Sequence, residues 1–286
     1  DACPDKTGEY VRENCKDERV QVFTNNRNLG VGGATIAGYR KALEADANYI
    51  VKLDGDGQMA PSLIPVLLAP LIKGEADYVK GNRFHALGSV SGMPKSRLLG
   101  NFLLSFASKL SSGYWNIFDP TNGFTAIHAD AARALPLSKI SHGYFFESDM
   151  LFYLGLLRAV VRDIPMEAYY GSETSGIRIP MVVPEFIFKH YVNTCRRIFI
   201  TYFLRETNVA TLQLILGKLL LLFGIVFGTI NWINSQTTGI NASAGTVVLA
   251  ALPVIVGSQL VIAFFGYDTR NIPKEPLQAA SAGSTK

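Results

Sequence analysis

Cysteine, histidine and net charge are all scarce in this sequence. Three cysteines in 286 residues (Cys3, Cys15 and Cys195) are too few for a disulfide framework or a metal cluster, and they indicate reduced thiols. The four histidines show no metal-ligand spacing. Charged residues make up only 17% of the chain and the net charge is +4, so nothing points to a nucleic-acid partner. These absences exclude a disulfide-rich secreted domain and a nucleic-acid-binding protein.

Apolar residues, in contrast, are abundant. They make up 48% of the chain, and this composition excludes a disordered or collagen-like protein. Two apolar stretches, 212–233 and 246–267, each have the ~20 residues that cross a ~30 Å hydrocarbon core. Two buried core helices are the alternative, but such helices rarely run so long without a polar face. We therefore predict a transmembrane hairpin over 211–268 and a tail over 269–286.

The distribution of lysine and arginine predicts the orientation of this hairpin. Basic residues precede the first stretch and follow the second, whereas the connection at 234–245 contains none. The positive-inside rule then places both long flanks in the cytoplasm and the connection outside. The expected protein is a two-span membrane protein with a cytoplasmic soluble part.

A different apolar pattern occupies 184–206, directly before the first span. Apolar residues recur there at helical spacing, while polar and basic residues gather on another side. This pattern is typical of an amphipathic helix on an anionic leaflet, and an ordinary core-facing helix is the alternative. We assign 179–208 to a juxtamembrane helix and expect Arg196 and Arg197 to lie at headgroup depth.

The first 175 residues alternate strand-like and helix-like runs, which predicts an α/β layer fold. Strands are expected at 19–24, 48–54, 76–84 and 124–130, and helices at 33–45, 61–72, 95–111 and 146–157. The chain opens without a methionine, and no strand leads into its first loop and helix. We expect an N-terminal segment with one strand to lie outside this sequence.

A glycine-rich stretch from Asn26 to Gly38 follows the first expected strand and opens a helix. Glycines at such a position can let the backbone approach a phosphate at a helix N-terminus. The stretch partly matches a dinucleotide fingerprint, and Asp54 could serve as the acid further along, so an NAD-binding protein is one interpretation. Thr35 stands where the third glycine belongs, and a tight structural turn explains the glycines equally well.

The segment Asp54-Gly-Asp56-Gly-Gln58 directly follows an expected strand. Two carboxylates one residue apart at a strand end provide hard oxygen ligands for Mg²⁺ or Mn²⁺, which would bridge a nucleotide diphosphate. A turn with solvated acids is the alternative. A dinucleotide site would need only the first acid and would leave Asp56 and Gln58 without a role.

Several sequence motifs, in their order along the chain, resemble those of glycosyltransferase family 2, whose inverting members have a GT-A fold. They lie at 1–7, 28–30, 53–58 and 81–84, and their spacing is similar to that of dolichyl-phosphate mannose synthase and bacterial polyprenyl-phosphate glycosyltransferases. Members of that branch often carry two C-terminal spans after an amphipathic helix. The resemblance implies a GT-A domain over 1–178 and the inner membrane of a bacterium or archaeon. The processive synthase motif Gln-x-x-Arg-Trp does not occur, which favours one sugar per turnover.

Carried over residue by residue, the resemblance implies a set of site residues. Asn122 departs from the serine that the family has before Gly123. The implied donor-binding residues are Asp5, Asn28, Gly30, Asp54 and Asp56; the metal ligands Asp54, Asp56 and Gln58; the catalytic residues Arg83, Asp119 and Glu147; and the acceptor-phosphate or membrane-surface residues Arg83, Lys95, Arg97, Arg196 and Arg197.

The implied reaction transfers one sugar from a UDP- or GDP-linked donor to a polyprenyl phosphate with Mg²⁺ or Mn²⁺. Asp119 and Glu147 would lie beside the sugar, although Glu147 could instead stabilise a helix N-terminus. Lys95 and Arg97 could equally lie on a solvated helix face. A lipid-linked saccharide as acceptor, and a membrane scaffold with a decayed transferase domain, remain alternatives. The sequence also leaves a homo-oligomer open.

Overall fold

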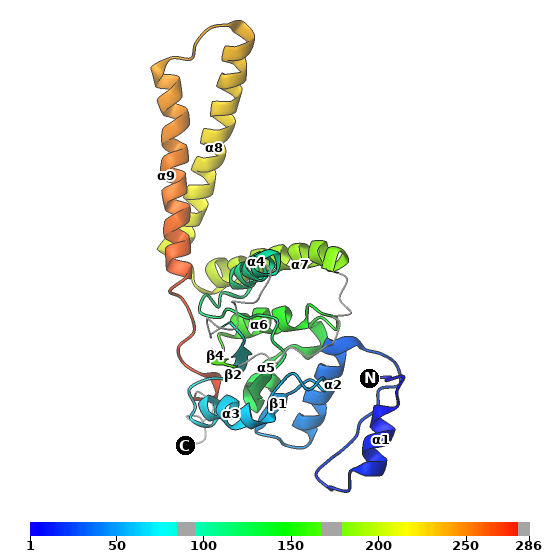
Figure 1. Ribbon diagram of the computed structural model, residues 1–286. Coiled ribbons are helices and arrows are strands. Elements are labelled where there is room, and N and C mark those ends of the chain that lie inside the picture. The colour runs from blue at the N-terminus through cyan, green and yellow to red at the C-terminus, as the bar shows by residue number, and fades with distance from the viewer. Residues whose placement is uncertain (85–94, 167–178, 280–286) are drawn as a thin grey trace. The chain divides into compact units, whose positions relative to one another are not determined.

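The computed structural model describes residues 1–84, 95–166 and 179–279, which form two compact units (Figure 1). The first unit comprises 1–194 together with 273–286, and the second comprises 195–272. The chain therefore leaves the first unit within one helix and returns to it after the second unit. The boundaries expected from the sequence, at 178, 208 and 268, differ from the boundaries between the two compact units, after 194 and after 272.

A four-stranded mixed sheet forms the centre of the first unit. The strand order is β1 (Tyr49–Lys52), β3 (Thr125–His128), β2 (Tyr78–Asn82) and β4 (Val161–Pro165). Strand β3 runs antiparallel to both β1 and β2, whereas β2 and β4 are parallel. Strands and helices alternate along the chain as the α/β prediction requires, and that fold class is confirmed.

The helices of this unit pack on the sheet and on one another. On one face, Leu67 and Leu71 of α3 are fully buried against Val79, Phe124 and Ala126 of the sheet region. This apolar layer accounts for much of the hydrophobic core. The helices are α1 (Thr7–Asn14), α2 (Gly30–Glu44), α3 (Ile64–Ile72, after a 3₁₀ turn at Pro61–Leu63), α4 (Lys95–Ser112), α5 (Ala129–Ala134) and α6 (Phe146–Leu157), with a further 3₁₀ turn at Leu137–Lys139.

The sequence misplaced some elements. The strand expected at 19–24 is wrong: these residues lie outside any strand, and Val22 and Thr24 instead accept hydrogen bonds from Arg12 of α1. An extended segment becomes a strand only when a neighbouring strand pairs with it, and none of the described strands does so here. Helices α1 and α5 and strand β4 were not expected, since each is short and has weak apolar periodicity.

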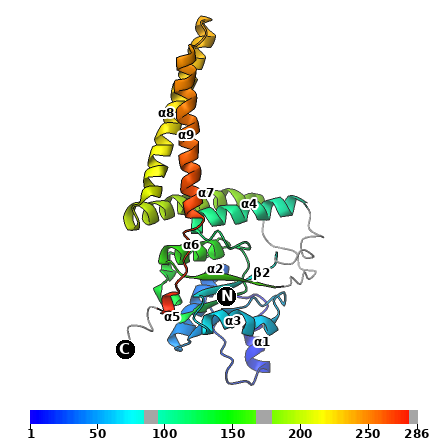
Figure 2. The same cartoon turned by 90° about the vertical axis from the view of Figure 1, so that its left-hand side faces the viewer.

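Helix α7 (Ile179–Phe199) lies beside α4 in both views of the ribbon (Figures 1 and 2). Two hydrogen bonds fix its N-terminal part within the first unit. The Ser111 hydroxyl of α4 and Nδ1 of His190 are 2.8 Å apart, and the Asn193 amide donates to Asp149 of α6 at 2.9 Å. The polar side chains at 190 and 193 therefore point into the protein.

The second unit is a helical hairpin. After α7 the chain forms a π-helical turn at Ile200–Arg205 and then α8 (Val209–Thr238) and α9 (Ala244–Asp268). Both are long and apolar enough to span a membrane, and among the described residues no other helix is. Gly217 and Gly257 let the two backbones approach closely, because a Cβ on Gly217 would lie 3.0 Å from the Gly257 carbonyl oxygen.

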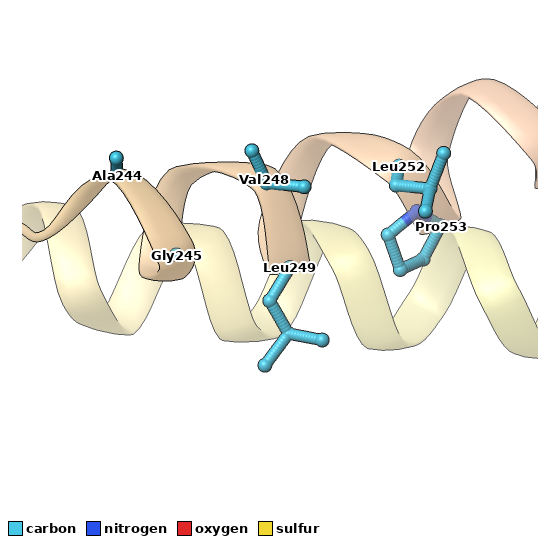
Figure 3. A pocket seen from close by; sticks show the side chains of 6 residues that line it. All are labelled: Ala244, Gly245, Val248, Leu249, Leu252 and Pro253. Carbon is cyan, nitrogen blue, oxygen red and sulfur yellow. The ribbon is translucent and has the colours of Figure 1, made fainter.

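The expected spans are confirmed as helices, with one correction to the connection between them. Helix α8 continues to Thr238 and ends at Gly239, whose φ of +70° is the left-handed conformation common after a helix C-terminus. The connection is therefore shorter than the expected 234–245. Beside it, an open groove along α9 is lined by Ala244, Gly245, Val248, Leu249, Leu252 and Pro253 (Figure 3).

After α9 the tail rejoins the first unit. The carboxylate of Asp77, fully buried, accepts the backbone N–H groups of Leu277 and Gln278 at 3.0 and 3.3 Å. The Gln278 side chain donates to the carbonyl oxygens of Leu71 and Ala76. The start of the expected tail is thus fixed beside α3 and the N-terminal end of β2 by four hydrogen bonds.

Candidate active site

Four polar side chains form a row across one face of the sheet. The strand register pairs Lys52 with Thr125, Thr125 with Lys80, and Lys80 with Asp163. Directly paired residues on neighbouring strands project to the same face. Lys52 and Lys80 have only 8% and 1% of their side chains exposed. Buried ammonium groups require charged or polar partners, so this face is organised by electrostatics.

The Asp-Gly-Asp loop begins two residues after β1. Asp54 is 36% exposed and Asp56 is exposed, so both carboxylates are accessible from solvent. One Asp56 oxygen accepts the N–H of Gln58 at 3.0 Å, and Gly57 has a φ of +72° that favours glycine. The sequence therefore placed these side chains correctly on one accessible loop.

The donor set of this loop suits a hard divalent cation. Two carboxylates and the Gln58 amide provide oxygen ligands of the kind that Mg²⁺ and Mn²⁺ prefer. In the part of the chain that the structure describes, no three His, Cys, Asp or Glu side chains converge on one point. The residues fit a cation whose remaining ligands are oxygens from outside the protein, such as those of a diphosphate.

Lys52 connects this loop to helix α6. Its Nζ lies 2.9 Å from an oxygen of Asp54 and 3.6 Å from an oxygen of Glu147, and it donates to the Gly123 carbonyl oxygen at 3.3 Å. The buried Lys52 ammonium thus lies close to both the Asp54 carboxylate of the loop and Glu147 in the first turn of α6. The sequence analysis missed Lys52. A lone lysine within an otherwise apolar strand was the signal that could have found it.

Gly123 packs directly against the Lys52–Asp54 ion pair. A Cβ at that position would lie 2.5 Å from the Lys52 Nζ and 2.6 Å from an Asp54 oxygen, which is closer than non-bonded atoms approach. The backbone of the segment before β3 therefore touches the Lys52–Asp54 pair directly. This contact explains why glycine follows Asn122 and why the segment belongs to the site.

Glu147 is nearly buried, with 11% of its side chain exposed. Burial raises its pKa above the ordinary value; the nearby Lys52 ammonium opposes this, and the Asp54 carboxylate adds to it. Its carboxylate faces Lys52, which supports a role in the site over one confined to the helix N-terminus. A carboxylate of raised pKa beside a metal loop is suited to orienting a substrate or exchanging a proton.

Asp119 has the opposite environment. Only 1% of its side chain is exposed, and both oxygens accept hydrogen bonds from the Arg83 guanidinium, at 2.8 and 2.9 Å. Burial alone would raise the pKa of Asp119, but these bonds and the Lys80 and Arg83 charges hold it below the ordinary value. Asp119 is therefore an anchor for Arg83, and its expected place beside the sugar stays a prediction.

Lys80 and Asp163 complete a charged cluster behind Arg83, and neither was singled out in the sequence. Lys80 Nζ donates to the backbone carbonyl oxygen of Asp119 and lies 3.8 Å from an Asp163 oxygen. Asp163 also accepts from the amide of Asn82 and the N–H of Phe118. The cluster fixes the segment before β3 against the ends of β2 and β4, and so positions both Arg83 and Gly123.

The glycine-rich stretch serves packing at two of its positions. The N–H groups of Gly32 and Gly33 donate to the His142 carbonyl oxygen at 2.7 and 3.1 Å. A Cβ on Gly32 would lie 2.4 Å from the Ser141 carbonyl oxygen. These N–H groups are therefore engaged, and the structural turn explains these two glycines better than a phosphate cradle. The close contact fixes the loop that leads into α6.

Other predicted donor-side residues lie near the start of α2. The Gly30 N–H donates to the Asn28 side chain at 2.8 Å and to the Asp1 carboxylate at 3.1 Å. Asp5 is exposed in the segment before α1. Nothing in the contacts of these three residues tests a nucleotide-binding role. Helix α4 begins at Lys95, but the side chains of Lys95 and Arg97 lie outside the described residues.

Arg197 belongs to the second unit and forms an ion pair there. Its side chain is 5% exposed and makes two hydrogen bonds to Asp268 at the end of α9, at 2.7 and 3.0 Å. The Tyr202 hydroxyl donates to the same carboxylate at 2.6 Å. Arg197 is buried and paired with a carboxylate from 71 residues further along, so it is not on an exposed surface, and its depth in a membrane stays a prediction. Its neighbour Arg196 is exposed.

Comparison with known proteins identifies the family. A profile described as glycosyl transferase family 2 matches residues 1–135, which include β1, the Asp-Gly-Asp loop, Arg83 and Gly123. Over 168 residues the chain is 34% identical to an undecaprenyl-phosphate mannosyltransferase of Micrococcus luteus, covering 58% of this chain and 68% of that protein. The chain belongs to glycosyl transferase family 2. The expected family and the expectation of a glycosyltransferase are thereby confirmed.

A second family 2 relative has a different sugar in its name. A UDP-N-acetylglucosamine–dolichyl-phosphate N-acetylglucosaminyltransferase of Methanococcus voltae is 32% identical over 152 residues, covering 53% of this chain and 60% of that protein. Both relatives are named for transfer to a polyprenyl-type phosphate, whereas their sugars differ.

Among solved structures, glucosyl-3-phosphoglycerate synthase from Mycobacterium tuberculosis, crystallised with Mn²⁺, UDP and glucosyl-3-phosphoglycerate, is a distant neighbour of this family 2 chain. The TM-score is 0.41 at 17% identity, with 63% of this chain and 57% of that chain covered. The site geometry comes from the hydrogen bonds and ion pairs of this chain and not from that neighbour.

Proposed function

We propose that this chain transfers one sugar, with inversion, from a nucleotide-diphosphate sugar to a polyprenyl phosphate in a divalent-cation-dependent reaction. The observation that carries the proposal is the accessible Asp54–Asp56 loop with Glu147 held against it by Lys52. Family membership and the acceptors in the relatives' names support the substrate classes. The nucleotide is UDP or GDP.

On the donor side, Asp54, Asp56 and Gln58 would hold Mg²⁺ or Mn²⁺, which as a Lewis acid supplies stabilisation of the departing diphosphate. The protein itself contributes position. Gly123 lets the backbone before β3 pack directly against Asp54, and Lys52 holds that carboxylate near Glu147. Such preorganisation lowers the barrier because the groups need not reorient during the reaction.

On the acceptor side, the nucleophile is a phosphate oxygen that is already anionic at neutral pH, since the second pKa of a phosphomonoester is about 6. Removal of a proton is therefore not essential. Arg83 is 30% exposed and held rigid by Asp119, an arrangement suited to binding a phosphate. Glu147 would orient sugar hydroxyls or stabilise positive charge at the anomeric carbon.

The exposed surfaces of α4 and α7 support a membrane as the place of reaction. Helix α4 exposes Leu99, Phe102 and Leu103, and α7 exposes Phe188 and Tyr191. His190, Asn193 and Arg197 of α7, in contrast, are buried, whereas its exposed side combines apolar residues with Glu185 and Arg196. Two neighbouring helices with exposed apolar faces suit insertion into the boundary between headgroups and acyl chains. The hairpin of α8 and α9 would then anchor the chain.

The decisive experiment is a donor screen. Membranes containing the full-length protein are incubated with Mg²⁺ or Mn²⁺, a short polyprenyl phosphate and each of a panel of radiolabelled UDP- and GDP-sugars. We expect label to enter the organic phase for one donor. Asp56→Asn should reduce that transfer at least ~100-fold with normal expression, because a ligand charge is lost. Glu44→Gln, an exposed acid of α2 outside the site, serves as the matched control.

Two results would contradict the proposal. Transfer at the wild-type rate in EDTA would exclude the metal role of the loop. Transfer to a lipid-linked saccharide but not to polyprenyl phosphate would replace the acceptor, and failure with every donor and both acceptors would favour a non-catalytic scaffold.

A further inference from the structure

The Asp-Gly-Asp loop already has a cation beside it, the ammonium of Lys52. Nζ is buried beneath the loop, 2.9 Å from Asp54 and 3.6 Å from Glu147. A Cβ at Gly123 would contact both Nζ and the second Asp54 oxygen, so the pair is enclosed on that side. The ammonium therefore neutralises much of the charge that would otherwise attract a metal ion.

The second carboxylate of the loop does not compensate for this. Asp56 is exposed, and one of its oxygens accepts the Gln58 N–H within the loop itself. Among the described residues, no third acid converges with Asp54 and Asp56. A divalent cation entering the free protein would meet two carboxylates, one of them paired with a lysine, and would feel the repulsion of a positive charge a few ångströms away.

We propose that Lys52 is a resident counter-ion and positioning residue that makes metal binding depend on the nucleotide. This inference rests on the proposed function. A nucleotide diphosphate brings the missing oxygen ligands and the negative charge that outweighs Lys52, so metal and nucleotide bind together and the metal alone binds weakly. The same ammonium keeps Asp54 and Glu147 at a fixed separation, which two carboxylates without a cation between them would not maintain.

The test is Mn²⁺ binding to the purified full-length protein, with free Mn²⁺ measured by electron paramagnetic resonance. Titrations are run without nucleotide and with UDP or GDP. The protein is in molar excess over the nucleotide, so that little Mn²⁺ is bound by nucleotide free in solution. For the wild type we expect at least tenfold tighter binding with one of the nucleotides. For Lys52→Met we expect Mn²⁺ alone to bind about fivefold to tenfold tighter, because a nearby positive charge is removed. The nucleotide should then add less.

Lys41→Met is the matched control, because Lys41 also contacts a carboxylate, Glu44 at 2.6 Å, but on the exposed side of α2. Its Mn²⁺ titrations should match the wild type. Lys52→Gln keeps a polar side chain and serves as a second variant with the same expectation, and thermal unfolding identifies folded samples. A Lys52 that only stabilises the fold would give weaker or unchanged Mn²⁺ binding in both variants.

The outcomes separate this inference from the proposed function. Tighter binding of Mn²⁺ alone by the Lys52 variants, together with slower sugar transfer, supports it. Equal Mn²⁺ affinity with and without nucleotide in the wild type, or no gain in the Lys52 variants, overturns it while leaving the transferase proposal intact. Absence of Mn²⁺ binding with either nucleotide overturns both.

Discussion

Glu147 and Asp119 show how two carboxylates of one site acquire different properties. Glu147 is nearly buried, with the Lys52 ammonium and the Asp54 carboxylate nearby, and burial raises its pKa. Asp119 is more deeply buried, yet two hydrogen bonds from Arg83 and the Lys80 charge lower its pKa. Burial raises the pKa of both carboxylates, and the difference between their pKa values therefore comes from hydrogen bonds and neighbouring charges. Of the two, Glu147 has the larger exposed fraction, 11% against 1%, and the raised pKa.

At the residue scale, Gly123 provides a sensitive test of the site. Gly123→Ala would place a Cβ 2.5 Å from the Lys52 Nζ and 2.6 Å from an Asp54 oxygen. We expect the pair to separate and sugar transfer to fall at least ~10-fold, since small displacements of catalytic groups cost this much or more. Steady-state kinetics measure the effect.

The control for this change is Gly100→Ala in α4, where a Cβ would have open space. That variant should retain wild-type kinetics and gain slightly in helix propensity. Wild-type kinetics in Gly123→Ala would show that the Lys52–Asp54 contact has no role in transfer.

At the scale of elements, α7 contributes buried polar groups to each of the two units separately. His190 and Asn193 bind α4 and α6 within the first unit, and Arg197 binds α9 within the second. These positions repeat at helical spacing, so one polar stripe faces protein along much of the helix. The exposed side carries Ile187, Phe188 and Tyr191 together with Glu185 and Arg196, an amphipathic surface that suits a lipid–water boundary.

His190 predicts how stability depends on pH. Burial lowers its pKa to about 4, compared with about 6.5 in an unfolded chain. The unfolded state therefore takes up a proton first as the pH falls, and stability is lost between about pH 6.5 and 4. The full loss is about 3 kcal/mol. Thermal unfolding of the detergent-solubilised protein over this range measures it.

The variant His190→Gln keeps a hydrogen-bonding side chain opposite Ser111 but does not titrate. In this variant only the carboxylates make stability depend on pH in this range. The difference in stability between the wild type and the variant should therefore shrink below pH 6. An unchanged pH profile in His190→Gln would mean that His190 is not the group responsible.

Arg197 and its neighbour Arg196 form a natural pair for mutation. Arg197→Met leaves the Asp268 carboxylate buried without its guanidinium and should cost about 3–5 kcal/mol of stability. Arg196→Met removes an exposed charge and should change stability by less than about 0.5 kcal/mol. Chemical denaturation in mild detergent compares the two. Equal small effects would place Arg197 in solvent, contrary to the structure.

At the scale of the whole molecule, the chain passes from the first unit through a helical hairpin and back again. Residues 277 and 278 hydrogen-bond to Asp77 in the first unit. With α8 and α9 as two spans, both flanks of the hairpin belong on one side of the membrane. The basic residues of those flanks predict that this is the cytoplasmic side.

Cysteine labelling in intact cells tests this topology. Cys3, Cys15 and Cys195 are exposed in the structure and should remain unlabelled by an impermeant thiol reagent, because their flank is predicted to be cytoplasmic. Asn241→Cys, between α8 and α9, should be labelled. Permeabilised cells provide the control, since the native cysteines should then react. Labelling of the wild type in intact cells would reverse the predicted orientation.

The sequence by itself determined the α/β class, the two long apolar helices and the accessible Asp-Gly-Asp loop. Each follows from local order along the chain: alternating runs, 20-residue apolar stretches and acids directly after a strand. Helix 146–157 was predicted to the residue because its apolar run has clear ends. Asp54 and Asp56 needed no distant partner to be placed, since adjacent loop residues stay together in any fold.

Only the tertiary structure decided which charges meet. Lys52 contacts Glu147 and Gly123, Arg83 contacts Asp119, and Arg197 contacts Asp268, each across 36 residues or more. The energy of a buried charge depends on the partner that strand register and helix packing bring to it, and residue type alone does not specify that partner. For this reason the sequence placed Arg197 at the surface and overlooked Lys52, the residue at the centre of the site.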